Sequence, residues 1–495
     1  MKKQFAHKKT ENPVSGWVKK ALFGGAALGM VMSLGMQSAV AGNGYAYAHA
    51  YGKDGFATIT PFNRVAKLPV VRDAYGQIDH KATYAKVQAA ALALANFVAL
   101  NNDSAVLGTS VIKGVDWVLG GTSKTCRSNP GTAACTAAEI SQAIIEIPSP
   151  FPIDPNDPTF LATGTVTAAN TKKASVLDFC NEHYAKQALG VSPIVSDKKV
   201  VNGYSHTPAL PCEVSIWNDD DHIYVDMLDP NAIFSLFFTD VLFSAEMSDP
   251  AFAEAITDLP PQVKSEIRAV VLHAMTEFDK KTKVVDKQMG PKYKSMDEVV
   301  EVVANSPYQS PYKHVGYTKA DGTAFTAAES MAVTQAIINT MSINGTASAG
   351  VHPTIVDGVP LDSILSAGSS WRSARATPLT LPGNNHVIEA CSPKYAKLAM
   401  GTGLHHVTAL PCEVTVQIID QDGNGTPETL AVSYLDPHFM LSALFADITE
   451  EEKIAFAAVP GAIMDDLQKI VAAALATNSG IALNPGVQIS YNMLP

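Results

Sequence analysis

The sequence predicts an α+β protein built from two tandem copies of a small antiparallel-sheet-plus-helices domain, with an additional, mainly helical N-terminal region. The first observation is a repeated phrase. "HTPALPCEVSI" at 206–216 and "HVTALPCEVTV" at 406–416 agree at seven of eleven positions. The second observation is that other segments recur in the same order in both halves. A repeat of this length indicates duplicated domains and not a short-period solenoid.

Four further pairs of segments support the repeat. They are 177–189 with 388–400, 226–241 with 433–448, 259–275 with 459–475, and, upstream, 136–145 with 326–338. The chain is therefore expected to divide into a signal peptide at 1–41, an N-terminal region at 42–135, a first repeat domain at 136–280 (core 170–280), a connector at 281–325, and a second repeat domain at 326–495 (core 385–480).

Each copy is expected to contain a capped helix, a hairpin and further helices. Asn181 and Ser392 are residue types that cap helix N-termini, and Pro393 suits a first helical turn. "CEVSIW" and "CEVTVQII" alternate as half-buried strands do, and "HIYVDML" and "TLAVSYL" are the returning strands. Asp229 and Asp436, each followed by proline, are expected to cap the next helix.

Two helices are expected outside the matched segments. "TYAKVQAAALALANFVAL" predicts a helix in the N-terminal region. "SMDEVVEVVA" predicts a short helix in the connector, because Ser295 and Glu298 have the spacing of a capping box.

The first 41 residues have the pattern of a secretory signal. A basic leader precedes an apolar run, "ALFGGAALGMVMSLG", and "AVA" at 39–41 offers small residues for cleavage after Ala41. The alternative is an uncleaved anchor, but the apolar run is shorter than the roughly 20 residues that span a bilayer. We therefore expect a soluble, periplasmic or extracellular protein with no membrane span after cleavage.

Composition excludes some classes of partner. The leader carries six lysines against Glu11, so its removal takes the formal net charge from −11 to −16. This balance argues against nucleic acid, whose binding depends on neutralising phosphates. The length exceeds what a single core accommodates, so two or three domains are expected.

Six cysteines remain after cleavage, and an even number in an oxidising compartment first indicates disulfides. Cys126 and Cys135 flank a Gly/Pro turn and are expected to form a structural disulfide. No Cys-x-x-Cys or Cys-x-x-Cys-His motif is present, so no thioredoxin-like centre and no attached haem is expected.

The repeat places the same residue types in each copy, and three interpretations of them remain open. The set is Cys180, His206 and Cys212 in the first copy, and Cys391, His406 and Cys412 in the second. The cysteines of each copy could form a disulfide. They could join histidine in a zinc or copper(I) site, with His183, His405 and His438 as unmatched extras. They could also be reactive thiols, since a cysteine before a helix N-terminus has a lowered pKa.

The order of cysteine before a helix with "YAKQAL" or "YAKLAM", then "LPCEV", then aspartate–proline resembles the family called domain of unknown function 302. The match covers roughly 170–280 and 385–480. The resemblance implies a small α+β fold of β-α-β4-α type that occurs in tandem. It implies no reaction. The family's asparagine–proline after the first cysteine is divided here, with Asn181 in one copy and Pro393 in the other.

Two other motifs have ordinary structural explanations. Asp420, Asp422 and Asn424 in "DQDGNG" resemble the start of a calcium loop, but Ala431 stands where a bidentate acid belongs, and Asn-Gly is a hairpin turn signal. Asp229 and Asp436 could be paired catalytic acids, although helix capping explains both. Gly-rich phosphate loops and the common hydrolase motifs are absent from the sequence, so no nucleotide is expected.

These observations predict an exported protein that binds a soft metal or a sulfur-containing ligand, or that serves as a disulfide-stapled binding module. Whether it is an enzyme is uncertain, and the sequence favours a non-enzyme. The alternatives are a thiol-based redox or sulfur-transfer enzyme and a structural or assembly protein. The ligand is expected where the two cysteines and the histidine of each copy meet. The two copies are expected to pack as an intramolecular pseudo-dimer about a pseudo-twofold axis.

Overall fold

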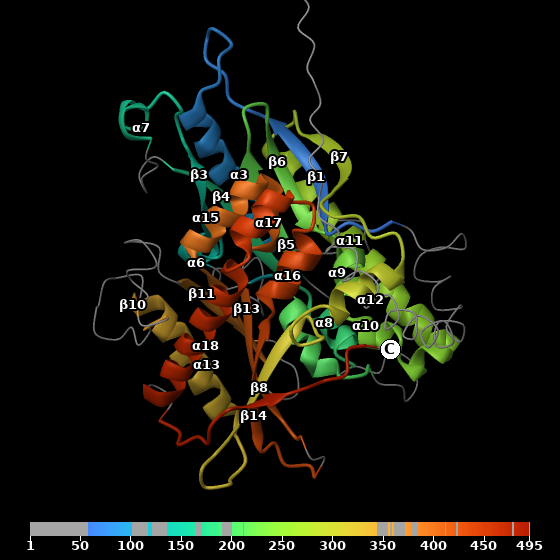
Figure 1. Cartoon of the computed structure of the whole chain (residues 1–495). Coiled ribbons are helices and arrows are strands. Elements are labelled where there is room, and N and C mark those ends of the chain that lie inside the picture. The colour runs from blue at the N-terminus through green and yellow to red at the C-terminus, as the bar shows by residue number, and fades with distance from the viewer. Residues whose placement is uncertain are drawn as a thin grey trace, which may run out of the picture.

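The protein is an α+β structure with two antiparallel sheets and helices around them (Figure 1). The computed structural model describes residues 58–100, 117–120, 136–164, 171–190, 200–210, 212–343, 355–356, 359–360, 372–378, 385–410, 412–421, 424–477 and 480–494. Within these ranges, no helix combines the length and the apolar character needed to cross a bilayer. The expected signal peptide and the pair Cys126 and Cys135 lie outside the described residues.

The first sheet has seven strands in the described part of the chain. Its order is β2 (Val118–Leu119), β4 (Thr171–Cys180), β5 (Cys212–Asn218), β6 (His222–Leu228), β1 (Phe62–Pro69) and β7 (Lys283–Met289), with β3 (Ile145–Pro152) also paired to β4. All of the pairings are antiparallel.

The second sheet has six described strands and a similar plan. Its order is β11 (Arg372–Pro378), β12 (His386–Cys391), β13 (Cys412–Ile419), β14 (Thr429–Leu435), β8 (Tyr312–Thr318) and β15 (Val487–Ile489). A separate two-stranded ribbon pairs β9 (Ile355–Val356) with β10 (Val359–Pro360).

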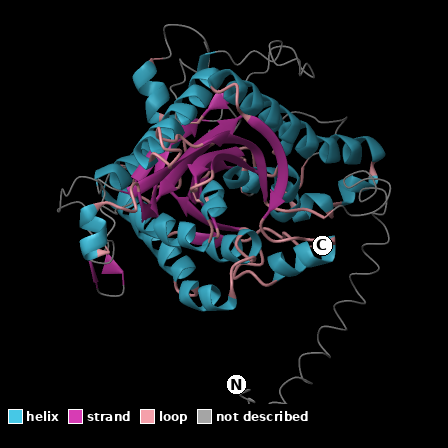
Figure 2. Cartoon of the chain, turned by 90° about the horizontal axis from the view of Figure 1, so that it is seen from above, coloured by secondary structure: helices cyan, strands magenta, loops and turns pink. Residues whose placement is uncertain are grey.

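Helices cover the outer face of each sheet, and Figure 2 shows them surrounding the curved strands. Val214 and Ile216 of β5 belong to a core with α3 (His80–Leu100) and α11 (Pro250–Phe278). Val414 and Val416 of β13 belong to a core with α13 (Ala327–Ile343) and α18 (Val459–Thr477).

Shorter helices connect these elements. In the first half they are α6 (Ala137–Gln142), α7 (Pro158–Thr163), α8 (Glu182–Ala188), α9 (Pro230–Phe237), α10 (Thr239–Leu242), α12 (Met296–Ala304) and the 3₁₀ helices η2 (Gly203–Ala209) and η3 (Ala245–Ser248). In the second half they are α15 (Pro393–Thr402), α16 (Pro437–Leu444), α17 (Glu450–Phe456) and the 3₁₀ helix η5 (Leu404–Ala409).

Several local expectations are confirmed. Asn181 caps α8, Asp229 caps α9 and Asp436 caps α16, each through its side-chain oxygen and a backbone N–H of the first turn. Ser295 caps α12 in the same way. Ser392 precedes α15 but makes no side-chain cap bond.

The N-terminal region is not the separate, mainly helical part that the sequence indicated. β1 lies between β6 and β7 in the first sheet, and the predicted helix is α3, which packs on β4 and β5. The connector likewise supplies β7 to the first sheet and β8 to the second. The first five residues of β1 are all buried, so buried and exposed positions do not alternate there. The period-two signal of a half-buried strand is therefore missing from this part of the sequence.

The segments 136–145 and 326–338 are similar in sequence because each contains a helix cap. The two helices do not occupy corresponding places in the fold. Thr136 and Thr326 each accept a bond from a backbone N–H three residues later, which explains the shared "TAAE". The helix that corresponds to α13 by its place against a sheet is α3, since α6 is only six residues long and packs on α3.

The two units exchange contacts through their 3₁₀ helices. η2 of the first unit packs against β8, β13 and β14 of the second, and η5 of the second unit packs against β4, β5 and β6 of the first. Val407 of η5 contacts a cluster with Val176 and Trp217 on the inner face of the first sheet. The Thr408 hydroxyl bonds the Ser215 hydroxyl at 2.7 Å.

One core also runs through both units. The rings of Phe237 and Phe439 meet edge to face at 5.1 Å. The Tyr312 hydroxyl donates to the Phe237 carbonyl at 2.9 Å, and the Tyr293 hydroxyl donates to the Ala443 carbonyl at 2.6 Å. These buried contacts tie the stability of one unit to that of the other.

We therefore predict that Phe439→Ala destabilises the whole chain as one unit. Phe439 is fully buried, and truncating such a ring costs about 3–5 kcal/mol. Urea denaturation followed by tryptophan fluorescence and by circular dichroism should show one transition at a lower midpoint. Ile454→Ala, at an exposed position, is the control and should change stability by less than about 0.5 kcal/mol. Two separate transitions, with only one shifted, would contradict the shared core.

Candidate functional site

The repeated phrase folds in each unit as a 3₁₀ helix followed by a strand. His206 lies in η2 and Cys212 is the first residue of β5, while His406 lies in η5 and Cys412 is the first residue of β13. The histidines point into the junction between the units, and Cys212 faces the helical layer of its own unit. In the first unit, the structure therefore does not bring the histidine and the cysteine of the phrase into one ligand set.

His206 is enclosed by partners on both ring nitrogens. Its Nε2 lies 2.8 Å from Oδ1 of Asp240, and its Nδ1 lies 3.2 Å from the Gly203 carbonyl oxygen. The ring stacks on Phe238 at 4.3 Å and meets Tyr312 of the other unit at 6.0 Å. No side-chain surface of His206 is exposed, so it has no open position for a ligand.

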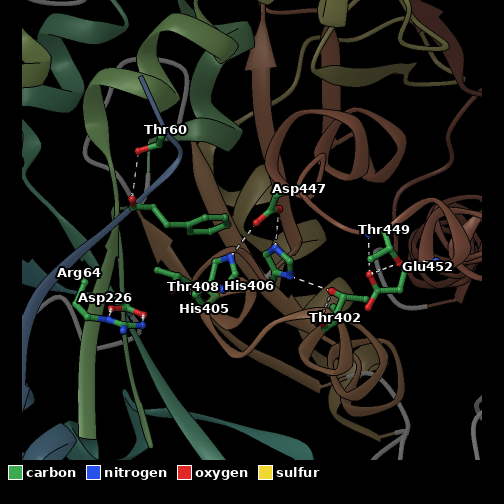
Figure 3. A network of polar contacts seen from close by, with 12 residues as sticks. Thr60, Arg64, Asp226, Thr402, His405, His406, Thr408, Asp447, Thr449 and Glu452 are labelled. Atoms are coloured by element: carbon green, nitrogen blue, oxygen red, sulfur yellow. Dashed lines mark hydrogen bonds and ion pairs between the residues drawn. The ribbon is translucent and has the colours of Figure 1, made fainter. Parts of the chain in front are cut away.

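His406 has corresponding neighbours. Its Nε2 lies 3.1 Å from Oδ1 of Asp447, and its Nδ1 lies 2.9 Å from the Thr402 hydroxyl (Figure 3). The ring contacts Phe445 at 4.4 Å and Phe62 of the first unit at 5.7 Å. Burial lowers the pKa of His406, and the neighbouring Asp447 carboxylate opposes this effect.

Cys180 ends β4 and Cys212 begins β5, and the strand register pairs Cys212 with Phe179, one residue before Cys180. The structure records both as thiols, one buried and one half-buried. Burial raises the pKa of the Cys212 thiol, and the nearby Cys180 raises it further. This is opposite to the lowered pKa that a nucleophilic thiol needs. The side chains of Cys391 and Cys412 lie outside the described residues.

An apolar pocket lies beside Cys212, between α8, α9 and α11. Its volume is about 630 Å³, including space open to solvent. Cys212, Tyr184 and Phe238 are among the lining residues, and Phe238 is the ring on which His206 stacks. His206 therefore supports the pocket wall without entering the pocket.

The second unit has a matching pocket of about 580 Å³ between α15, α16 and α18. The two linings use corresponding positions of the matched segments. Corresponding pairs are Tyr184 and Tyr395, Ala188 and Ala399, Leu210 and Leu410, Phe238 and Phe445, and Pro260 and Pro460.

Each pocket has a tyrosine–acid pair at its wall. The Tyr184 hydroxyl donates to Glu266 of α11 at 2.5 Å, and the Trp117 indole N–H donates to the same carboxylate at 2.8 Å. In the second unit, the Tyr395 hydroxyl donates to Asp466 of α18 at 3.1 Å. Burial, followed by the Glu266 bond and charge, raises the pKa of Tyr184. A neutral hydroxyl beside a carboxylate can orient one polar group of a ligand.

The remaining sequence candidates have structural roles. The Asp420 carboxylate accepts the backbone N–H groups of Asn424 and Gly425, which closes the predicted turn between β13 and β14. Asp422 lies outside the described residues, so the calcium prediction is untested. His438 contacts the Asp436 cap, and burial lowers the pKa of His183 on α8.

Sequence reasoning missed a group of four buried acids at the junction of the sheets. Asp178 pairs with Glu213 across β4 and β5, and Glu389 pairs with Glu413 across β12 and β13. A Cβ atom placed on Gly120 would lie 2.6 Å from a Glu389 oxygen and 3.0 Å from the Asp178 Cβ, so the two pairs face each other. The sequence feature that could have pointed to these acids is the glutamate that follows the repeated cysteine in each copy.

These acids influence one another. Burial raises the pKa values of Glu213 and Glu413 well above the usual range, and the neighbouring acids raise them further. Among the described residues, neither carboxylate oxygen of Glu413 has a hydrogen-bond partner. Both shifts favour the protonated form of these glutamates in the folded protein.

Comparisons with known proteins add no family and no function. No protein-family model matches the chain, no curated protein matches it, and no solved structure matches it. The resemblance to the domain of unknown function 302 family therefore stays a prediction.

The raised pKa of the Cys212 thiol predicts slow alkylation of the native protein. Because the thiolate is the reactive form, Cys212 should react with iodoacetamide at pH 8 at least about tenfold more slowly than in denaturant. Peptide mass spectrometry would give the rate, with Cys212→Ser to identify the peptide. Rapid native labelling would contradict the raised pKa. Failure to label Cys180 and Cys212 before reduction, even in denaturant, would show that they form a disulfide.

The raised pKa values of the buried glutamates predict that the free energy of unfolding falls as pH rises. A glutamate has a pKa of about 4.3 when unfolded, so a raised folded-state pKa disfavours the folded state progressively above that pH. The double replacement Glu213→Gln with Glu413→Gln should stabilise the protein at pH 8 and change its stability little at pH 4. The gain at pH 8 should be about 1.4 kcal/mol for each unit by which folding raises the pKa of a replaced glutamate. Denaturant midpoints from pH 4 to pH 8 test this. A wild-type advantage that grows toward pH 8 would contradict it.

Proposed function

We propose that this is an exported, non-enzymatic binding protein in which two copies of one duplicated unit each hold a compact, mainly apolar ligand. The observation that carries the proposal is the pair of matching pockets, because unrelated surface hollows would not share corresponding lining residues in two units.

The chemistry of the walls supports an apolar ligand with one polar group. Apart from Cys212, the described lining consists mostly of aliphatic side chains, aromatic side chains and prolines, and the tyrosine–acid pair supplies a hydrogen-bonding position. Cys212 could contact a sulfur-containing ligand as a neutral thiol. Its raised pKa counts against a metal–thiolate bond and against thiol transfer in the first unit.

The places of the pockets and the partners of the two histidines also support binding without catalysis. The pocket in the first unit lies beneath α9 and α11, and the corresponding pocket in the second lies beneath α16 and α18. The two histidines that could act as bases are engaged with Asp240 and Asp447 at the unit junction. Export rests on the N-terminal leader and is part of this proposal.

A titration with 1-aminoanthracene, a compact apolar fluorescent probe, tests the pockets. The wild-type chain should bind two molecules. Ala188→Phe should fill the first pocket and Ala399→Phe the second, because each alanine lines its pocket at a corresponding position. Each single variant should bind one molecule, and the double variant none.

Circular dichroism would confirm that the variants fold. The control is Ala85→Phe, at an exposed position on α3, which should keep two sites. A stoichiometry of two in the double variant, or no saturable binding by the wild type, would overturn the proposal.

A further inference from the structure

A further group of polar side chains lies at the junction between the units. His405 and His406 of η5 and Asp447, which lies between α16 and α17, each place a donor atom within 4.8 Å of the others. His405 Nε2 lies 3.3 Å from Oδ2 of Asp447, and His406 Nε2 lies 3.1 Å from Oδ1. Figure 3 shows both rings directed at this carboxylate.

Hydrogen bonds hold the His406 ring in place. Its Nδ1 lies 2.9 Å from the Thr402 hydroxyl, and that hydroxyl donates to the Ala399 carbonyl at 2.7 Å. When Nδ1 carries the ring proton, Nε2 presents its lone pair toward Asp447, which is the form in which an imidazole binds a metal ion.

The three side chains can share one metal ion, because their donor atoms lie within 4.8 Å of one another. Bonds of about 2.0–2.1 Å in a tetrahedral site place ligand atoms about 3.3 Å apart, and each histidine Nε2 lies 3.1–3.3 Å from one of the two Asp447 oxygens. A metal-bound histidine commonly donates its other ring N–H to an oxygen, and the Thr402 hydroxyl lies 2.9 Å from His406 Nδ1.

We propose that His405, His406 and Asp447 bind one divalent transition-metal ion of the zinc class at the junction between the units. Two imidazoles and one carboxylate form a donor set that suits zinc and leaves positions for water. The side chains of His405 and Asp447 are 21% and 28% exposed, so an ion can reach the site from solvent. None of the three side chains lines an apolar pocket, so metal binding and probe binding can be measured separately.

Gly403 makes room for the two rings. A Cβ atom at this position would lie 2.9 Å from Cε1 of His405 and 3.1 Å from Nδ1 of both His405 and His406. Any side chain here would push the rings apart.

The first unit provides an internal comparison, because it has Ser205 where the second has His405. Its pair of His206 and Asp240 is closed to solvent, with 0% and 2% of the side chains exposed. The second Asp240 oxygen accepts from Asn202 at 2.9 Å. Only two donors are available there, so the first unit is expected to bind no metal.

The test is a metal titration of the full chain after removal of bound metal with a chelator. Calorimetry with Zn²⁺ should give one site per chain, and Co²⁺ should produce visible absorption typical of nitrogen and oxygen ligands. His405→Ser makes the second unit like the first and should weaken Zn²⁺ binding at least about 100-fold, because even outer-sphere changes cost 10–100-fold. Cys180→Ser combined with Cys212→Ser should leave the affinity unchanged.

His405→Gln is a second variant that retains a polar side chain, in case His405→Ser does not fold by circular dichroism. Loss of binding in either folded variant supports the site. The proposal is overturned if the wild type shows no saturable Zn²⁺ binding, if both folded variants bind as tightly as the wild type, or if binding disappears only in the cysteine variant. In that last case, the thiols would be the ligands.

Discussion

The arrangement of the molecule depends on one reciprocal contact, in which each unit inserts a 3₁₀ helix into the inner face of the other. His206 meets Tyr312 across the junction, and His406 meets Phe62. Each ring also packs on a phenylalanine that lines the pocket of its own unit. The same side chains therefore hold the units together and shape the pockets, so neither feature can change alone.

The helix caps and the turn could be predicted from the sequence because each depends on neighbouring residues. Asp229 and Asp436 cap helices through backbone groups two residues away, and a local signal of this kind is visible in the chain.

The partners of the histidines could not be predicted, because they lie far away in the chain and outside the matched phrases. Phe62 and Tyr312 begin β1 and β8, and β1 carries no alternation, since the opposite unit covers its inner face. For the same reason, nothing local showed that His206 and Cys212 point to different sides. Each pocket is formed by three or four segments that only the folded chain brings together.

The units match at their pockets and differ on their inner faces. In the first unit, Arg64 pairs with Asp226 at 2.8 Å and lies over the Tyr224 ring, and Trp217 donates to the same carboxylate. In the second unit, His314 contacts Ser433 at 2.7 Å, and burial lowers its pKa to about 3. The first junction face therefore carries a buried ion pair, and the second carries neutral polar groups.

The exchange of 3₁₀ helices also sets the order in which the chain can be completed. The inner face of the first sheet receives η5, whose residues are made about 190 positions after β5 begins. A ribosome adds on the order of 5–20 residues each second, so this face waits roughly ten seconds or more for its cover. Until η5 has been synthesised, the inner face of the first sheet lacks the segment that covers it. A chain that must stay unfolded until it has left the compartment where it is made would gain from this delay.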